Sequence, residues 1–272
     1  MYKLIKNYKI SKLRFKQFYW KILYLIKVLT VPSNYFLITK SQNNNLENIF
    51  LKNISKHINK KTFIEIGFAY DQFNCIGLIE NNFSGKLIDA AINDNLNISI
   101  MKLISKRINK DIIVINKFID LDNINEVFTE KELGCLSIDI DGNDYWILSK
   151  ILENEIMPEM IILEYNTSFL NYSITIPYNK NFKFSYEIPY YYYHGASLKA
   201  FHKLLQKYNY SLVKSIFGTN AIFLNKDLMN KTGYKNYLPE ELHEDCPSRN
   251  RAGNNNSKEQ FEKIKDFPLT KI

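Results

Sequence analysis

Short apolar segments recur through the middle of the chain, and helical patterns alternate with them. The segments have the length of buried strands and occupy residues 62–66, 86–90, 111–116, 135–140 and 160–164. The stretches before and between them carry apolar residues at helical spacing, at residues 45–59, 73–82, 95–108, 123–132 and 143–154. A strand that returns after roughly 25 residues, with a helix between, is typical of successive βαβ units on a parallel sheet. Right-handed crossovers then place helices on both faces of that sheet.

The alternation of strand and helix patterns stops after residue 164. Residues 165–194 contain Pro177, Pro189 and four consecutive tyrosines, Tyr190–Tyr193. Alternating apolar and polar positions predict a β-rich insertion here, lying over the carboxyl ends of the strands. Its tyrosines either pack against the fold or form an aromatic wall that contacts a ligand.

A further helical pattern and two further strand patterns follow the insertion, at residues 195–208, 210–216 and 220–224. A short turn joins the last two, which predicts an antiparallel hairpin. The expected fold is therefore α/β: a Rossmann-like, doubly wound, mostly parallel seven-stranded sheet that ends in an antiparallel hairpin. Sheets of this kind bind ligands outside the carboxyl ends of their strands.

Acidic residues end four of the five expected parallel strands, namely Glu65, Asp89, Asp139 and Glu164. Burying an unpaired carboxylate costs free energy, so four of them on one edge of one sheet are seldom accidental. The sequence therefore predicts a functional site at this edge.

The stretch 136–148, L-S-I-D-I-D-G-N-D-Y-W-I-L, adds two more carboxylates to that edge, Asp141 and Asp144. Asp139 and Asp141 stand two apart and project from one face of a strand. Such close like charges repel unless a cation, a proton or a ligand hydroxyl lies between them. Asp144 is expected to cap the helix that follows. His194 could reach the same edge from the insertion.

The net charge of +8 is concentrated at the N-terminus. Residues 1–40 hold eight lysines, Arg14 and no acidic residue, which leaves 27 basic and 28 acidic side chains in the remainder. We expect a basic amphipathic arm over 1–44, the α/β domain over 45–225 and a polar, loosely packed tail over 226–272. The near-neutral body excludes nucleic acid as an expected partner.

Residues 1–31 could lie on an anionic membrane surface or cover a groove on the fold itself. The apolar run 18–31 is interrupted by Lys21 and Lys27, so it is too short and too charged to span a bilayer. No small-residue cleavage site follows it, which argues against secretion. The three cysteines are far apart and odd in number, as expected of reduced thiols. The sequence predicts a cytoplasmic protein that could contact the inner face of the membrane.

Several motifs in this order resemble one enzyme family. F-I-E-I-G-F at 63–68 is similar to the first cofactor motif of class I S-adenosylmethionine-dependent methyltransferases. The stretches at 136–148, 158–166, 194–201 and 218–224 together resemble an FkbM-type branch of that class, which is often associated with surface-polysaccharide genes. The resemblance covers about residues 62–225.

The resemblance implies a role for each matching residue. Gly67 would let the backbone approach the methionine part of S-adenosylmethionine, and Glu65 would accept from its amino group. Asp89 would accept from the two ribose hydroxyls. Asn74 would supply polar contacts where the loop after Gly67 takes another course than in the family. Asp139 would lie where the cofactor's methyl group meets the acceptor, as cofactor contact and general base.

Metal-assisted sugar O-methyltransferases of related fold imply a further role for this edge. Asp139, Asp141, Glu164 and Asn166 occupy places similar to the metal ligands of those enzymes. Carboxylate and amide oxygens suit Mg²⁺ or Ca²⁺. A cation there would lower the pKa of an acceptor hydroxyl and orient it.

The leading interpretation is a methyltransferase that acts on a hydroxyl of a sugar or glycan precursor. Asp139-Ile140-Asp141 also matches the D-x-D pattern of metal-dependent glycosyltransferases, a second interpretation. The usual first motif has further glycines where this chain has Phe68, Ala69 and Tyr70. That departure keeps a third interpretation open: a non-catalytic, membrane-peripheral protein on a degenerate methyltransferase fold.

Overall fold

The computed structural model describes residues 26, 44–68, 74–79, 81–90, 111–128 and 132–272. The basic arm expected over 1–44 lies almost entirely outside the described residues, as does the helix expected over 95–108. Within the described part of the chain, no helix combines the length and the apolar character needed to cross a membrane.

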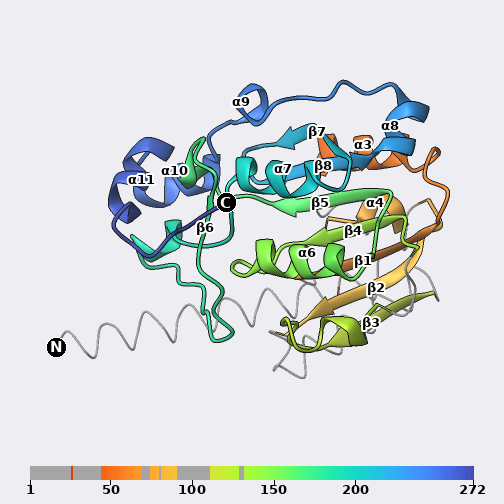
Figure 1. Cartoon of the computed structure of the whole chain (residues 1–272), viewed down its shortest axis with the longest axis horizontal. Helices are drawn as coiled ribbons and strands as arrows, with labels where there is room; N and C mark the ends of the chain where they lie inside the picture. Colours follow the sequence, from red (N-terminus) through yellow and green to blue (C-terminus); the bar gives the residue numbers. More distant parts are fainter. Residues whose placement is uncertain (1–25, 27–43, 69–73, 80, 91–110, 129–131) are drawn as a thin grey trace.

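A seven-stranded sheet forms the centre of the molecule (Figure 1). Its strand order is β3-β2-β1-β4-β5-β8-β7. The strands are β1 (Thr62–Ile66), β2 (Ser84–Asp89), β3 (Ile112–Asn116), β4 (Cys135–Ile138), β5 (Met160–Glu164), β7 (Tyr210–Ile216) and β8 (Asn220–Asn225). The first five pair in parallel, whereas β8 is antiparallel to both β5 and β7. The predicted Rossmann-like sheet with a terminal hairpin is therefore confirmed.

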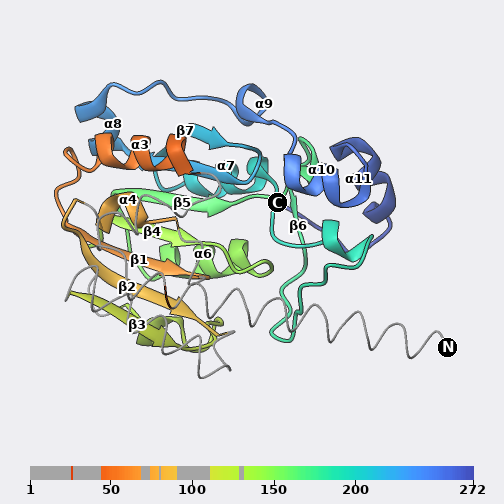
Figure 2. The same cartoon turned by 180° about the vertical axis from the view of Figure 1, so that it is seen from behind.

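Helices cover both faces of the sheet (Figures 1 and 2). One face carries α6 (Asp144–Glu153) and α7 (Leu198–Gln206). The other carries α3 (Asn44–Ile54), α4 (Ile76–Ile79) and α8 (Lys226–Thr232).

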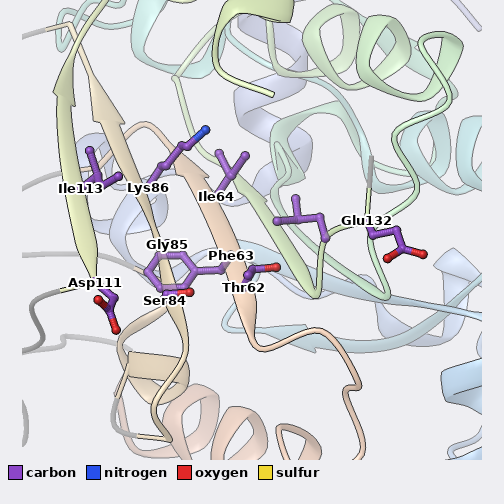
Figure 3. A pocket seen from close by; sticks show the side chains of 10 residues that line it. Thr62, Phe63, Ile64, Ser84, Gly85, Lys86, Asp111, Ile113 and Glu132 are labelled. Carbon is purple, nitrogen blue, oxygen red and sulfur yellow. The ribbon is translucent and has the colours of Figure 1, made fainter. Parts of the chain in front are cut away.

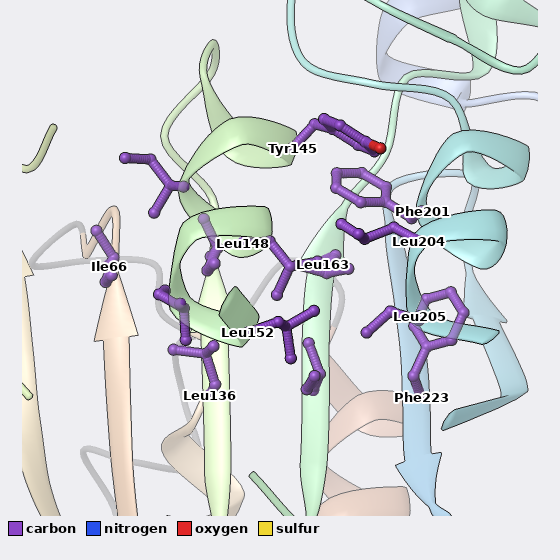
Figure 4. Packing of buried hydrophobic residues seen from close by; sticks show 14 of the residues in the cluster. Ile66, Leu136, Tyr145, Leu148, Leu152, Leu163, Phe201, Leu204, Leu205 and Phe223 are labelled. Carbon is purple, nitrogen blue, oxygen red and sulfur yellow. The ribbon is translucent and has the colours of Figure 1, made fainter. Parts of the chain in front are cut away.

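Strand residues alternate between these two cores. On the first face, Leu148 and Leu152 of α6 lie against Leu136 and Leu163 of the sheet (Figure 4). Cys135, one position before Leu136, belongs to the core of the other face. Because both faces are buried, the strands read as continuous apolar runs, which is why their positions were predictable.

Over residues 123–128, the described part of the helix expected near residues 123–132, an α-helix was the wrong prediction. The structure instead has a short 3₁₀ helix, η1 (Ile124–Glu126). Just before it, the Asp120 carboxylate accepts a hydrogen bond from the backbone N–H of Asn123 at 3.1 Å. Local side-chain bonds of this kind offer the backbone an alternative to an α-helix.

The insertion over 165–194 contains less strand than expected. Its one strand, β6 (Ile174–Thr175), pairs with β9 (Thr270–Lys271) in a separate two-stranded sheet. Irregular chain makes up most of the rest, together with the 3₁₀ helices η2 (Thr167–Phe169) and η3 (Tyr190–Tyr192). Proline lacks the N–H that a strand ladder needs, so Pro177 limits the length of β6.

The segment 226–272 is folded, and the prediction of a loosely packed tail is wrong. Beyond α8 it forms α9 (Pro239–Leu242), α10 (Pro247–Gly253) and α11 (Ser257–Ile264). Figures 1 and 2 show α10 and α11 beyond the carboxyl ends of the parallel strands, next to β6. Gln260 of α11 is fully buried and accepts a hydrogen bond from the Ser168 hydroxyl at 2.6 Å. Buried polar residues with partners look the same in a sequence as exposed ones.

A cavity of about 200 Å³ lies at the amino ends of β1, β2 and β3 (Figure 3). Its charged lining residues are Lys86, Asp111 and Glu132. None of the predicted site residues lines it. It lies at the opposite edge of the sheet from the one where open α/β sheets bind ligands.

Candidate functional site

Gly67 allows the ends of β1 and β4 to come into close contact. Its φ is +93°, and an added Cβ would lie 1.6 Å from the backbone oxygen of Asp139. The Gly67 N–H donates to the Ile88 carbonyl at 2.9 Å, and the Asp139 N–H donates to the Ile66 carbonyl at 2.9 Å. The chain's own backbone therefore requires a glycine here, whatever ligand it binds.

A cavity of about 240 Å³ opens at this edge, between the strand ends and the insertion. It brings together Gly67 after β1, Asp89 at the end of β2 and Asp141 after β4. Phe182 and Phe184 line it from the insertion. The remaining lining residues are Ile66, Ile88, Ala90, Lys117, Phe118, Ile119, Ile140, Gly142 and Asn143.

Phe68, which raised doubt about the first motif, does not enter this cavity. Its side chain is 2% exposed and packs in the core on the face of α3 and α4. Ala69 and Tyr70 lie outside the described residues.

Glu65 and Asn74 belong to a buried polar network beside the loop that follows β1. The Glu65 carboxylate accepts from the backbone N–H of Asn74 at 2.7 Å and of Cys75 at 2.9 Å. The Asn74 amide donates to Ser137 at 3.1 Å and accepts from Asn220 at 3.0 Å. These bonds fix the loop after β1, and direct contact of Glu65 or Asn74 with a cofactor stays a prediction.

Asp144 holds the loop between β4 and α6. Its carboxylate is 1% exposed and accepts from the backbone N–H of Ile140 at 2.9 Å and of Gly142 at 2.8 Å. The N-cap of α6 is Asn143 and not Asp144, so the predicted capping role is wrong. Asp144 shapes the loop that carries Asp141, whose φ of 55° lies in the left-handed region.

Asp139, Asp141 and Glu164 form an acidic cluster at the ends of β4 and β5. Burial above all, followed by neighbouring carboxylates, raises the pKa values of Asp139 and Glu164 well above their usual range. The two carboxyl groups hydrogen-bond to each other, which requires a proton between them. Burial first, and then the Glu164 charge, raises the pKa of Asp141 to about 8. The cluster therefore keeps protons at neutral pH.

Asn166 does not join this cluster as a metal ligand, contrary to expectation. Its amide nitrogen donates to the carbonyls of Tyr192 at 2.9 Å and His194 at 2.8 Å. Its amide oxygen accepts from the Ser168 N–H at 3.0 Å. The side chain is 1% exposed and ties the insertion to the end of β5.

Arg249 of α10 enters the acidic cluster, and the sequence analysis missed it. Its Nη2 donates to Glu164 Oε1 at 2.7 Å and contacts His194 Nε2 at 3.1 Å. Its Nη1 donates to the carbonyls of Tyr165 at 3.2 Å and Gly218 at 3.4 Å. The residue is 3% exposed. The one available signal was indirect, since so many carboxylates at one edge need a counter-charge.

His194 lies at the cluster, as hypothesised from its place in the insertion. It is 2% exposed, and its ring lies edge-on to Phe184 with centroids 5.0 Å apart. Burial, and then the Arg249 charge, lowers the His194 pKa well below its usual value. The imidazole is therefore neutral.

Among the described residues, one group offers the donors of a metal site. Asp141, Glu164 and His194 each place a donor atom within 4.8 Å of the others. This set differs from the predicted one, because it lacks Asp139 and Asn166 and adds His194. The Arg249 guanidinium already contacts two of its three members.

Comparisons with known proteins give structural likenesses of low identity. No protein-family model matches the chain, and no curated protein does. An O-methyltransferase from Bacillus cereus in complex with SAH matches with a TM-score of 0.44 and 14% identity, over 74% of this chain and 89% of that one. Cofactor-bound Rv0187 from MTB matches with a TM-score of 0.44 and 11% identity, over 75% and 88%. M. capricolum TrmK in complex with SAH matches with a TM-score of 0.38 and 16% identity, over 72% and 74%. Likenesses this distant carry no argument about function, which is argued from the site.

Proposed function

We propose that this protein is an S-adenosylmethionine-dependent methyltransferase that acts on a hydroxyl of a sugar or glycan precursor. One observation carries the proposal: a single cavity joins Gly67, Asp89 and Asp141 from the ends of three neighbouring parallel strands. The strand order reverses at β1, so this cavity lies where open α/β sheets bind nucleotide-like ligands. The first-motif resemblance at 63–68 supports the same cofactor.

Asp89 is proposed to hold the ribose of the cofactor. A carboxylate at the end of β2 can accept from two neighbouring hydroxyls at once. S-adenosylmethionine, when bound, supplies a methyl group on a positively charged sulfonium.

The proton of the acceptor hydroxyl is proposed to pass to Asp141. Asp139, the predicted base, shares a proton with Glu164, whereas Asp141 lines the cavity and has a pKa of about 8. A base titrating near neutral pH can take a proton from an acceptor hydroxyl. Phe182 and Phe184 form one wall of the cavity and would pack against the ring of the acceptor. A neutral polyol adds no negative charge to the acidic cluster.

The expected metal is not part of this proposal. Both the nitrogen and the oxygen of the Asn166 amide bond to groups of the protein. Arg249 contacts two of the remaining donors, Glu164 and His194. The proposed chemistry therefore relies on carboxylates and on the guanidinium.

Calorimetry with S-adenosylhomocysteine tests the proposal. We expect micromolar binding to the full chain, weakened about tenfold or more by Asp89→Ala, because the ribose hydroxyls lose their acceptor. Asp266→Ala, at an exposed aspartate near the C-terminus, is the matched control and should bind like the wild type. Absence of binding to the folded wild type would contradict the proposal.

Two further titrations address the other interpretations. Binding of a nucleotide sugar only in the presence of Mg²⁺ would favour a glycosyltransferase that uses Asp139 and Asp141. Binding to anionic vesicles that requires residues 1–31, with no small-molecule binding, would favour a membrane-peripheral protein. Vesicle binding together with S-adenosylhomocysteine binding would agree with an enzyme that works at the inner face of the membrane.

A further inference from the structure

The acidic cluster has a cation of its own. Arg249 Nη2 lies 2.7 Å from Glu164 Oε1 and 3.1 Å from His194 Nε2, two of the three groups that could hold a metal. The third, Asp141, also interacts electrostatically with the guanidinium. A metal ion bound by this set would have to take the place of Nη2.

The terminal nitrogens of Arg249 have no hydrogen left for a substrate. Each carries two hydrogens, and the four partners are Glu164, His194 and the carbonyls of Tyr165 and Gly218. The guanidinium is thus held by the end of β5, the insertion and the turn of the hairpin. Its role is to position these parts and not to contact the acceptor.

The acceptor atoms of His194 and Glu164 are occupied by Arg249 in the same way. A guanidinium can only donate, so His194 Nε2 must accept, and its lone pair faces Arg249. That lone pair is the one a metal would use, unless the ring ligated through Nδ1. One oxygen of Glu164 also accepts from Arg249. Two of the three donors, Glu164 and His194, therefore already bind Arg249, whereas His194 Nδ1 has no hydrogen-bond partner.

Charge balance agrees with this arrangement. An arginine keeps its positive charge at every accessible pH, and it binds carboxylates more strongly than a neutral donor does. The single positive charge of Arg249 therefore offsets one of the three carboxylates, that of Glu164.

We propose that Arg249 is the resident cation of this site and takes the place of a divalent metal. The C-terminal segment thereby contributes a cation to the acidic cluster at the ends of β4 and β5. The inference concerns the acidic cluster itself, and its main test needs neither the cofactor nor the acceptor.

Titration with Mn²⁺, followed by electron paramagnetic resonance, tests the proposal. The wild type should bind no Mn²⁺ at micromolar concentrations. Arg249→Ala should gain one Mn²⁺ site, because it frees Glu164 and His194, and Arg249→Gln should gain it as well. Arg251→Ala is the matched control, since Arg251 is exposed on the same helix, and it should behave like the wild type.

Two results would overturn the proposal. One is stoichiometric, tight binding of Mn²⁺ by the wild type that Glu164→Gln abolishes. The other is a folded Arg249→Ala or Arg249→Gln protein, judged by circular dichroism, that gains no Mn²⁺ site. If neither variant folds, the wild-type titration alone decides. If the wild type bound no S-adenosylhomocysteine while the Mn²⁺ titrations gave the expected results, the proposed function would be contradicted and this inference would stand.

Discussion

Gly67 is set by the chain's own backbone, and this can be tested directly. Gly67→Ala should lower the free energy of unfolding by more than about 3 kcal/mol, since the new Cβ would clash with the Asp139 carbonyl and φ is unfavourable. The matched control is Gly233→Ala, at a similar positive φ of 64° with no atom within 4 Å of the new Cβ. The free energy of unfolding of this variant should fall by about 1 kcal/mol. Urea denaturation measures both, and equal losses would contradict the account.

Asp141 gives the proposed reaction its pH dependence. Its pKa is raised to about 8, chiefly by burial, and only the ionised carboxylate can accept a proton. The kcat/KM of the methyl transfer should therefore rise about tenfold per pH unit below 8 and level off above it. Asp141→Asn should abolish the rise. A rate that is flat between pH 6 and about 9 would exclude Asp141 as the base.

The sequence allowed some of these residues to be predicted and not others. Asp89 ends a strand and Asp141 follows one, so the pattern that predicts the sheet also predicts their place at its edge. Arg249 belongs to the polar stretch S-R-N-R-A-G, where nothing distinguishes it from the exposed Arg251. Only tertiary contacts make one of these two arginines part of the site.

At the scale of elements, the strands were the most predictable part. Their apolar runs are bounded by glycine, proline or charge, and each of the seven strands of the main sheet begins and ends within two residues of its predicted limits. The insertion and η1 were less predictable, because side-chain hydrogen bonds such as those of Asp120 determine their turns. Hydrophobic periodicity carries no information about such bonds.

Glu65 links the end of β1 to the start of α4 and should make folding pH-dependent. Burial raises its pKa from 4.5 to about 7, so the folded state binds this proton more tightly than the unfolded state. Its contribution to stability is therefore largest below about pH 4.5, falls as the pH rises to about 7, and amounts to about 3 kcal/mol. Glu65→Gln removes the titrating group and should flatten the slope of unfolding free energy against pH.

Comparison with Glu187→Gln isolates this effect from the other carboxyl groups. Glu187 is exposed, so that variant should keep the wild-type slope. Parallel slopes for the wild type and Glu65→Gln would show that the proton on Glu65 does not contribute.

At the scale of the whole molecule, the carboxyl edge of the sheet is covered by parts distant in sequence. The insertion provides Phe182, Phe184 and His194, and the C-terminal segment provides Arg249. Strand β9 pairs with β6, so the end of the chain holds the insertion in place. The sheet could be predicted because its contacts are periodic. This cover could not, since it depends on single hydrogen bonds such as that between Ser168 and Gln260.

Glu164 and Arg249 are 85 residues apart in the sequence, so the ribosome makes them at different times. At about 5 to 20 residues per second, a ribosome needs roughly 4 to 17 seconds to make that length of chain. All five parallel strands have been translated before the arginine exists. During this interval the end of β5 lacks its guanidinium partner, and the contacts of Arg249 can form only after α10 has been made.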